Sequence, residues 1–279
     1  MNIEAALLYG RSQLTPHSPT PQLDARLLLE YLLDVPYSYL VVHHDQLLTA
    51  DQEQQYRLLL HRAQQQEPIP YITGQAPFFD FDLHVTPAVL IPRPETEQLV
   101  ETAVSWARQH SARTAADVGT GSGCIAIALA RFLPEMQVTA VDISPAALAV
   151  AQQNAQRLAP GRIQFQQSDL LHAVAGSFDM IVANLPYVTT GEWQSLADGV
   201  KLHEPALALD GGEDGLDIIR RLLEQAVTRL RPNGAIFLEI GWQQGQGAQA
   251  EAQRIFPQAS IAVLPDYAGH DRIVKIVIG

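Results

Sequence analysis

Strand-like and helix-like segments alternate along the chain from about residue 95 onward. Short apolar runs typical of buried strands are separated by longer runs in which apolar residues recur at helical spacing. Parallel neighbouring strands need a long crossover, usually a helix, so this alternation predicts a parallel β-sheet covered by helices. The expected strands lie at 114–118, 136–142, 163–166, 179–184, 235–240, around residue 261 and at 273–278. The expected helices begin at about 95 and lie at 122–132, 145–158, 216–230 and after 240. The sequence therefore predicts an α/β fold with a seven-stranded, Rossmann-like sheet.

The first third of the chain has a different character. Over residues 1–67, apolar side chains recur at helical spacing, and prolines and turn residues divide this run into three segments. These features predict a small helical bundle that serves for packing or for docking a partner. Residues 68–94 are rich in proline, and apolar residues from Phe79 to Leu83 alternate with polar ones. We therefore expect a β-hairpin linker over 68–94 and one large domain over 95–279.

Composition excludes several classes of protein. Hydrophobic residues make up 47% of the 279 residues, which excludes a disordered chain. Thirty acidic side chains and 18 basic ones give a net charge of −12, and the sequence has no basic stripe. Direct nucleic-acid binding is therefore not expected, and a local basic cleft on an otherwise acidic surface is the alternative. The single cysteine, Cys124, allows neither an internal disulfide nor a thiolate metal cluster, and no metal site is expected.

The sequence also carries expectations about location and assembly. No uncharged apolar run reaches the roughly 18 residues that a membrane span needs. We therefore expect a cytoplasmic protein without membrane contact. No heptad pattern stands out, which favours a monomer.

A glycine-rich loop joins the first strand of the predicted sheet to the helix that follows. Gly119, Gly121 and Gly123 occupy positions where the backbone would approach a ligand without intervening side chains. Asp117 precedes the loop, and Asp142 ends the next strand. A carboxylate at the end of that strand can accept hydrogen bonds from both hydroxyls of a ribose. The pattern predicts a cofactor site, and a glycine-rich turn without a ligand is the alternative.

The spacing of these glycines favours S-adenosylmethionine over a dinucleotide. A dinucleotide loop would have its third glycine where this chain has Cys124, and the spacing here is G-x-G-x-G. S-adenosylmethionine has no phosphate, so we expect its amino-acid part to be held by the loop backbone and by Asp117 near its ammonium group. Asp169 is expected near the exocyclic amine of adenine and Leu170 against the ring, although Leu170 is equally typical of core packing. The predicted cofactor contacts are Asp117, Gly119, Thr120, Gly121, Ser122, Gly123, Asp142, Asp169, Leu170 and Asn184.

The fourth predicted strand ends in Asn184-Leu185-Pro186-Tyr187. Ligands of open α/β sheets lie beyond the carboxyl ends of the strands, so Asn184 and the glycine loop should face one crevice. The side-chain oxygen of Asn184 and the backbone carbonyl of Leu185 can each accept a hydrogen bond from a planar, conjugated NH2 group. Pro186 would hold the turn rigid, and Tyr187 would stack on the plane of that group. Standing alone, the segment would be an ordinary Asn-x-Pro turn, but beside a methyl-donor loop it predicts an acceptor site.

This acceptor site suits the methylation of an amide. An amide nitrogen is a weak nucleophile because its lone pair is delocalised, so it must attack the methyl group in line and at close approach. Acceptors for its N–H groups would stabilise the positive charge that develops on nitrogen. The proton becomes acidic only as the C–N bond forms, so we expect no catalytic histidine. We assign the catalytic roles to Asn184 and Tyr187.

Further motifs occur along the whole chain. They are Ile-Pro-Arg-Pro-Glu-Thr-Glu at 91–97, Glu204-Pro205 with Leu207, Gly211-Gly212 with Asp214-Gly215-Leu216, and Asp-Tyr-Ala-Gly-His-Asp-Arg at 266–272. Together with residues 117–123 and 184–187, these motifs make the chain resemble the release-factor glutamine methyltransferases of the HemK/PrmC family. The resemblance implies a class I S-adenosylmethionine-dependent methyltransferase domain behind a helical N-terminal domain and a hairpin linker.

The resemblance also implies a substrate and its contacts. The family transfers a methyl group from S-adenosylmethionine to the side-chain amide nitrogen of the glutamine in the Gly-Gly-Gln motif of bacterial class 1 peptide chain release factors. Residues 184–187 would hold that glutamine. Arg93 and Glu95 would lie at the edge of the active cleft, although an arginine fixed between two prolines is equally suited to brace the domain junction.

Leu185 departs from the family pattern, which usually has proline at this position. A hydrophobic residue here also occurs in adenine-N6 methyltransferases that act on ribosomal RNA, whose target is likewise a planar, conjugated NH2 group. Those enzymes would be expected to carry a basic surface and lack the Pro-Arg-Pro-Glu-Thr-Glu segment. The alternatives are therefore adenine-N6 methylation of nucleic acid and an inactive, cofactor-binding scaffold that docks the release factor.

Overall fold

The chain divides into two compact units in the computed structural model, which describes residues 1–279 apart from the side chain of Asp198. The first unit comprises residues 1–75 together with 197–203, and the second comprises 76–196 and 204–279. The helical unit thus extends beyond residue 67 and includes a short segment from far along the chain.

Helices packed around an apolar core form the first unit. The core helices are α1 (Ile3–Leu14), α2 (Pro21–Leu33), α3 (Tyr37–Val42), α4 (Ala50–Gln64) and α5 (Ile69–Thr73), and α10 (Asp198–His203) also belongs to this unit. A capping box between Thr49 and Gln52 starts α4, because each side chain accepts a hydrogen bond from the other's backbone N–H. Inside the core, the Tyr56 hydroxyl donates to the Ala25 carbonyl at 2.9 Å. The predicted helical bundle is present, with α3 and α10 added, which are too short to give a periodic signal.

A two-stranded hairpin follows, formed by β1 (Gln75–Phe78) and β2 (Phe81–His84). Phe81 and Leu83 are buried, as their alternation with polar residues predicts. Phe79 lies in the turn with φ +51°, so the strand is shorter at its start than the sequence suggested. The Phe79 N–H donates to Glu97 Oε1 at 2.7 Å, which fixes this left-handed turn.

A seven-stranded sheet forms the centre of the second unit, in the order β5-β4-β3-β6-β7-β9-β8. The strands from β5 to β7 are parallel, and β9 runs antiparallel to both β7 and β8. The bounds are β3 (Thr114–Val118), β4 (Gln137–Asp142), β5 (Ile163–Gln167), β6 (Phe178–Asn184), β7 (Leu230–Glu239), β8 (Ser260–Pro265) and β9 (Asp271–Val277). The chain order reverses at β3, between β4 and β6, and open α/β sheets bind ligands at such a switch point.

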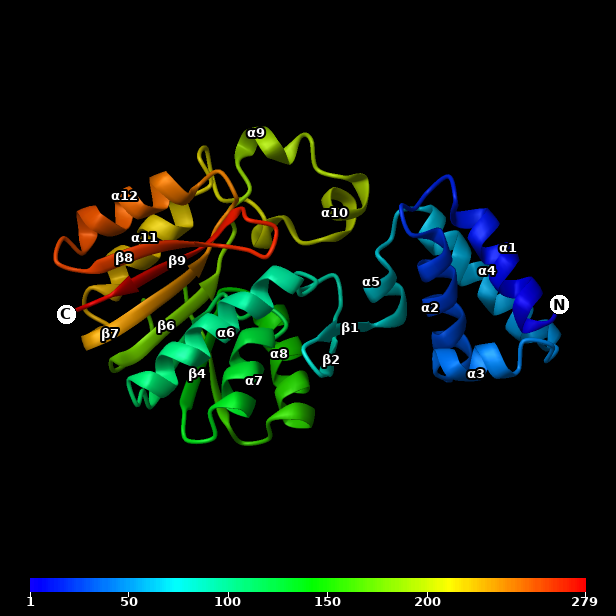
Figure 1. Cartoon of the computed structure of the whole chain (residues 1–279), viewed down its shortest axis with the longest axis horizontal. Coiled ribbons are helices and arrows are strands. Elements are labelled where there is room, and N and C mark those ends of the chain that lie inside the picture. The colour runs from blue at the N-terminus through cyan, green and yellow to red at the C-terminus, as the bar shows by residue number, and fades with distance from the viewer. The chain divides into compact units, whose positions relative to one another are not determined.

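Helices cover both faces of this sheet (Figure 1). On one face lie α6 (Pro94–Gln109), α7 (Cys124–Phe132) and α8 (Pro145–Leu158), and on the other lie α11 (Asp217–Ala226) and α12 (Gly245–Ile255). Residues 125–130 of α7 are all buried because this helix packs on the sheet between α6 and α8. The predicted helix start at 122 is two residues early, since Gly123, with φ +85°, caps α7.

The segment from 185 to 230 differs most from the expectation. It contains α9 (Thr190–Trp193), α10 and the 3-10 helix η1 (Ala206–Ala208), all too short to show apolar periodicity. The following helix ends at Ala226, and β7 begins at Leu230 rather than at 235, where it pairs with Phe178. Among the described residues, no helix combines the length and apolar character that a membrane crossing would require.

Candidate active site

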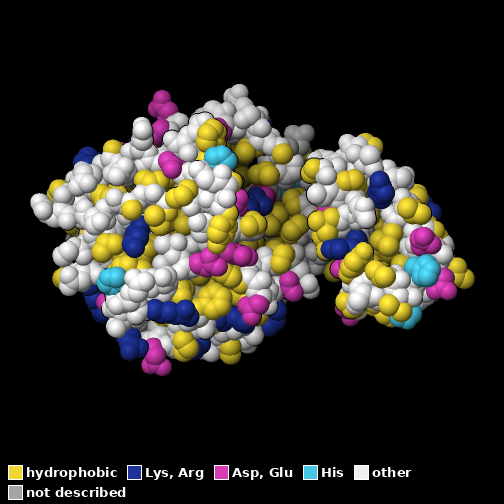
Figure 2. Space-filling view, in the orientation of Figure 1, with side chains coloured by type: hydrophobic (Ala, Val, Ile, Leu, Met, Phe, Trp, Pro, Cys, Tyr) yellow, Lys and Arg dark blue, Asp and Glu magenta, His cyan; other side chains and the backbone are white. Residues whose placement is uncertain are grey.

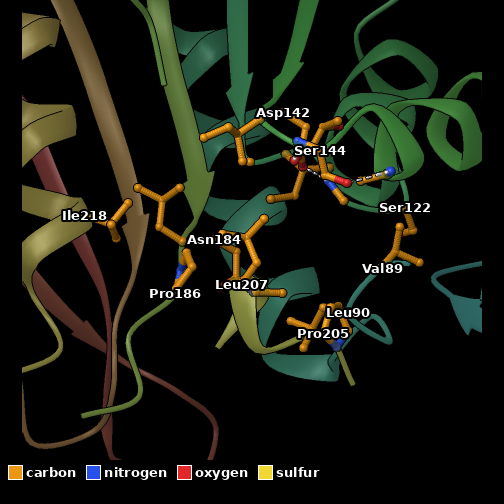
Figure 3. Close-up of a pocket in the computed structure, with 18 of the residues that line it drawn as sticks. Val89, Leu90, Ser122, Asp142, Ser144, Asn184, Pro186, Pro205, Leu207 and Ile218 are labelled. Atoms are coloured by element: carbon orange, nitrogen blue, oxygen red, sulfur yellow. Dashed lines mark hydrogen bonds between the residues drawn. The ribbon is translucent and has the colours of Figure 1, made fainter. Parts of the chain in front are cut away.

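A cavity of about 450 Å³ lies at the carboxyl ends of β3, β4 and β6 in the second unit. Figure 3 shows that Asp142 from the end of β4, Asn184 and Pro186 from the end of β6, and Leu207 from η1 border this one space. Residues of the glycine loop, of the segment 88–93 before α6 and of the η1 region at 205–208 also line the cavity, as does Thr96 in the first turn of α6. The topology thus brings the predicted donor loop and the predicted acceptor motif to the same cavity.

The glycine loop turns sharply where β3 ends. Gly119 and Thr120 both donate their N–H groups to the Val141 carbonyl at 2.9 Å, which ties the loop to β4. Gly119 and Gly121 have φ values of +75° and +54°, a region that favours glycine. A Cβ at Gly119 would approach Leu185 Cδ2 to 3.0 Å, so the loop and the acceptor motif are in close contact. Gly119, Thr120, Gly121 and Ser122 line the cavity, whereas Gly123 is not among its lining residues.

Asp117 lies beneath this loop and does not line the cavity. Its Oδ2 accepts hydrogen bonds from the Thr120 hydroxyl at 2.6 Å and from the Ala126 N–H at 3.0 Å. Burial raises the pKa of this carboxyl to about 7. Asp117 therefore connects the loop to α7, and a direct contact with the ammonium group of a ligand stays a prediction.

Asp142 is held rigidly at the end of β4. Its Oδ2 accepts the Gly121 N–H and its Oδ1 accepts the Ser144 N–H, both at 2.9 Å. Burial raises the pKa of this carboxyl from its ordinary value. Each oxygen retains further lone-pair capacity, and the residue lines the cavity, so its carboxylate is available to ligand hydroxyls.

Asp169 and Leu170 also line the cavity, on the side nearest α11. Asp169 Oδ2 forms an ion pair with Arg221 Nη2 at 2.5 Å, a contact that the sequence did not predict. Leu170 has φ +52° and belongs to the buried core of the sheet. Leu170 therefore packs in the core and also borders the cavity, and its contact with an adenine ring stays a prediction.

Asn184 is the last residue of β6 and lies opposite Glu239, the last residue of β7. Its Nδ2 donates to Thr96 Oγ1 at 3.0 Å. Leu185 and Pro186 line the cavity beside Asn184. Tyr187 is not among the lining residues, and its hydroxyl donates to Glu239 Oε1 at 3.3 Å. The proposed stacking of Tyr187 on the substrate therefore stays a prediction.

Sequence reasoning missed Thr96 and Glu239 as site residues. Both are 1% exposed, and the Thr96 hydroxyl donates to Glu239 Oε2 at 2.7 Å. The sequence did contain a signal for Glu239, because this acidic residue follows an apolar strand directly, just as Asp142 does. Thr96 lies in the motif at 91–97, but its role could not be predicted, since its position opposite Asn184 arises only when α6 packs on β6 and β7.

Arg93 lies at the cavity, whereas the ion pair that it forms is not at the junction of the two units. The Nη2 of Arg93 forms this ion pair with Glu204 Oε1 at 2.5 Å. Glu204 is only 5% exposed, so this pair joins the start of α6 to the segment before η1 within the second unit. Glu95 is not among the lining residues.

Known proteins match this chain along most of its length. The family model of the PrmC N-terminal domain matches residues 5–74, and that of the methyltransferase small domain matches residues 96–200. The crystal structure of a methyltransferase from Pyrococcus furiosus superposes with a TM-score of 0.55 at 20% identity, covering 81% of this chain and 98% of that one, which shows a shared fold.

Sequence relatives are more specific. A release factor glutamine methyltransferase of Koribacter versatilis is 44% identical over 92% of this chain and 91% of its own length. Another, from Moorella thermoacetica, is 42% identical over 90% of this chain and 89% of its own length. Since this identity extends over both units, the chain belongs to the release factor glutamine methyltransferase family.

Proposed function

We propose that the chain transfers a methyl group from S-adenosylmethionine to the side-chain amide nitrogen of the glutamine in the Gly-Gly-Gln motif of class 1 peptide chain release factors. The observation that carries this proposal is the position of Asn184. It lines the same cavity as the glycine loop and Asp142, and its amide nitrogen is already engaged by Thr96. The names of the relatives at 44% and 42% identity support the same reaction.

S-adenosylmethionine fits the donor side of the cavity. When bound, it supplies a methyl group activated by its sulfonium. The volume of about 450 Å³ is typical of sites for ligands of this size. Asp142 would accept hydrogen bonds from the ribose hydroxyls, and the backbone at Gly119 and Gly121 would approach the amino-acid part. Among the described residues, Asp117 Oδ1 is buried without a hydrogen-bond partner, which supports a positively charged ligand above the loop.

The acceptor side suits a primary amide. Asn184 Oδ1 and the Leu185 carbonyl would each accept one N–H of the target glutamine. As the new C–N bond forms, positive charge develops on the substrate nitrogen, and two fixed acceptors stabilise it more than they stabilise the neutral amide. The nitrogen loses its proton only after the charge has developed, so the reaction needs no strong base beforehand.

The helical unit would dock the release factor. Support comes from apolar side chains that remain exposed on its surface, as Figure 2 shows. A groove on this unit is lined by Leu8, Leu23, Arg26 and Tyr37 from α1, α2 and α3. The net charge of −12 favours a protein substrate over nucleic acid. We further assign the protein to the cytoplasm, where release factors act, and expect a monomer.

Incubation of the full chain with a purified release factor and methyl-labelled S-adenosylmethionine tests the proposal. The expected result is one methyl group on the glutamine of the Gly-Gly-Gln motif, located by mass spectrometry of proteolytic fragments. Ribosomal RNA is incubated in parallel. Label in the RNA would instead establish the adenine-N6 alternative, and cofactor binding without transfer to either substrate would establish an inactive scaffold.

A further inference from the structure

We propose that Thr96 and Glu239 fix the side-chain amide of Asn184 in one orientation, and that this orientation makes the site select an amide over a carboxylate. The inference rests on the proposed function, since it names what the acceptor site recognises. Thr96 and Glu239 act through Asn184 and are positioning residues.

The hydrogen-bond donors and acceptors in this cluster leave one arrangement when Glu239 is ionised. The Thr96 hydroxyl has a single hydrogen, and it lies 2.7 Å from Glu239 Oε2, which can only accept. The hydroxyl oxygen is then left as an acceptor for the group 3.0 Å away on Asn184, which must be the Nδ2 amide. A flipped Asn184 would put its oxygen against the lone pairs of Thr96 with no hydrogen between them. Asn184 Oδ1 is therefore left for the substrate.

The fold holds each member of this cluster in place. Asn184 and Glu239 are paired across β6 and β7, so their side chains leave the sheet at the same edge. Thr96 is in the first turn of α6, which packs on both strands and thus bridges their ends. The Tyr187 hydroxyl donates to the other oxygen of Glu239 at 3.3 Å and holds that carboxylate from the second side. Thr96 and Glu239 are 1% exposed, so water does not compete for these hydrogen bonds.

This orientation gives the site its selectivity. A primary amide offers two N–H donors to Asn184 Oδ1 and to the Leu185 carbonyl. A carboxylate at the same place has no hydrogen to offer and would meet two acceptors, which repel it. If Asn184 were free to flip, its Nδ2 would face the cavity and donate to a carboxylate. Loss of the Thr96 hydroxyl should therefore let a glutamate side chain bind more tightly. It should also lower the rate of methyl transfer to glutamine.

The test compares Thr96→Val, Thr96→Ala and Thr96→Ser in the full chain. Two quantities are measured: kcat for methylation of a release factor, and the ratio between the inhibition constant of a Gly-Gly-Glu release factor and the KM of the Gly-Gly-Gln form. Contacts that both forms share cancel in this ratio. Thr96→Val is expected to lower kcat by about 10- to 100-fold and the ratio by about tenfold. Thr96→Ser, which keeps the hydroxyl, should stay close to wild type in both.

Thr102→Val is the matched control, because Thr102 is on the same helix and donates to the Gln98 carbonyl away from the cavity. It should change neither quantity. Thr96→Ala also removes the hydroxyl, and alanine has no branched side chain. This variant therefore tests the role of the hydroxyl if Thr96→Val does not fold. An unchanged ratio in the folded hydroxyl-free variants, or a Thr96→Ser enzyme as impaired as they are, overturns the inference. Failure of the wild-type enzyme to methylate the release factor overturns the proposed function instead.

Discussion

Asn184 and Leu185 contribute different atoms to the proposed acceptor site. Asn184→Ala removes a side-chain acceptor and is expected to slow methyl transfer by about 10²–10³ with little change in cofactor affinity. Leu185→Pro keeps the backbone carbonyl and should retain most of the activity. Because Leu185 is buried, we expect this substitution to lower the free energy of unfolding by on the order of 2 kcal/mol. Single-turnover methylation, calorimetric titration with S-adenosylmethionine and denaturant unfolding measure these effects, and equal rate losses in the two variants would contradict the assignment.

Glu239 should make the transfer rate depend on pH. Burial raises the pKa of this carboxyl to about 7, while Arg272 lowers it and Glu95 raises it further. Below that pH, the protonated carboxyl can donate to Thr96, and the orientation of Asn184 is no longer fixed. We therefore expect kcat to fall as the pH is lowered through 7, and Glu239→Gln to lack this transition.

A pH–rate profile of both enzymes provides the measurement. Asp117 is the competing origin, since burial raises its pKa to about 7 as well. A transition that persists unchanged in Glu239→Gln would assign the pH dependence to Asp117 and the loop.

At this scale, residues were predictable where a strand or loop carries a motif within a short stretch of sequence. Residues 119–122 of the glycine loop, Asp142 and Asn184 line one cavity, as their places at the strand ends predict, whereas their contacts with ligands stay predictions. The Thr96–Glu239 hydrogen bond joins residues 143 positions apart, and only packing of α6 on the sheet creates it. Asp117 and Tyr187 are not among the lining residues, because a sequence motif does not distinguish a side chain that lines a cavity from one behind it; their contacts with ligands stay predictions.

The Arg93–Glu204 ion pair joins the N-terminus of α6 to the residues just before η1. Arg93→Met leaves the buried carboxylate of Glu204 without its charged partner, so we expect a loss of about 1–3 kcal/mol in the free energy of unfolding. The double variant Arg93→Met/Glu204→Met removes both charges and should recover part of that loss. Denaturant unfolding of wild type, single and double variants measures the coupling, and additive losses would show that the pair contributes nothing.

Strands and long helices were predicted well because their apolar periodicity extends over many residues. The helix over Pro145–Leu158 and the strand over Thr114–Val118 have the expected bounds. Elements of three to six residues, such as α9 and η1, contain too few apolar positions to establish a period. The early start of β7 was also hidden, because Pro232, Asn233 and Gly234 indicate a turn although the structure includes them in the strand.

For the whole molecule, removal of residues 1–75 should separate docking from chemistry. All cavity-lining residues lie in the second unit, so a chain of 76–279 is expected to bind S-adenosylmethionine and to methylate a short Gly-Gly-Gln peptide like the full chain. Its rate on an intact release factor should fall strongly. Calorimetry and steady-state kinetics on both substrates provide the measurement.

This truncation needs a control for α10, which belongs to the first unit although it lies at 198–203. His203 Nε2 is 3.3 Å from the Gln65 carbonyl, and that contact is lost when the first unit is removed. In a second truncated chain, a Gly-Ser linker replaces residues 197–203 and thus removes α10, which has lost the rest of its unit. Wild-type rates on intact release factor from either truncated chain would disprove the docking role.

Asn184 pairs with Glu239 across β6 and β7, and the two residues are synthesised at different times. The ribosome synthesises the glycine loop, Asp142 and Asn184 before it reaches Glu239, and Thr96 precedes them all. A nascent chain therefore carries its donor-binding residues and its acceptor asparagine before the carboxylate that orients that asparagine exists. Discrimination between an amide and an acid is consequently the last property of the active site to be completed as the chain is made.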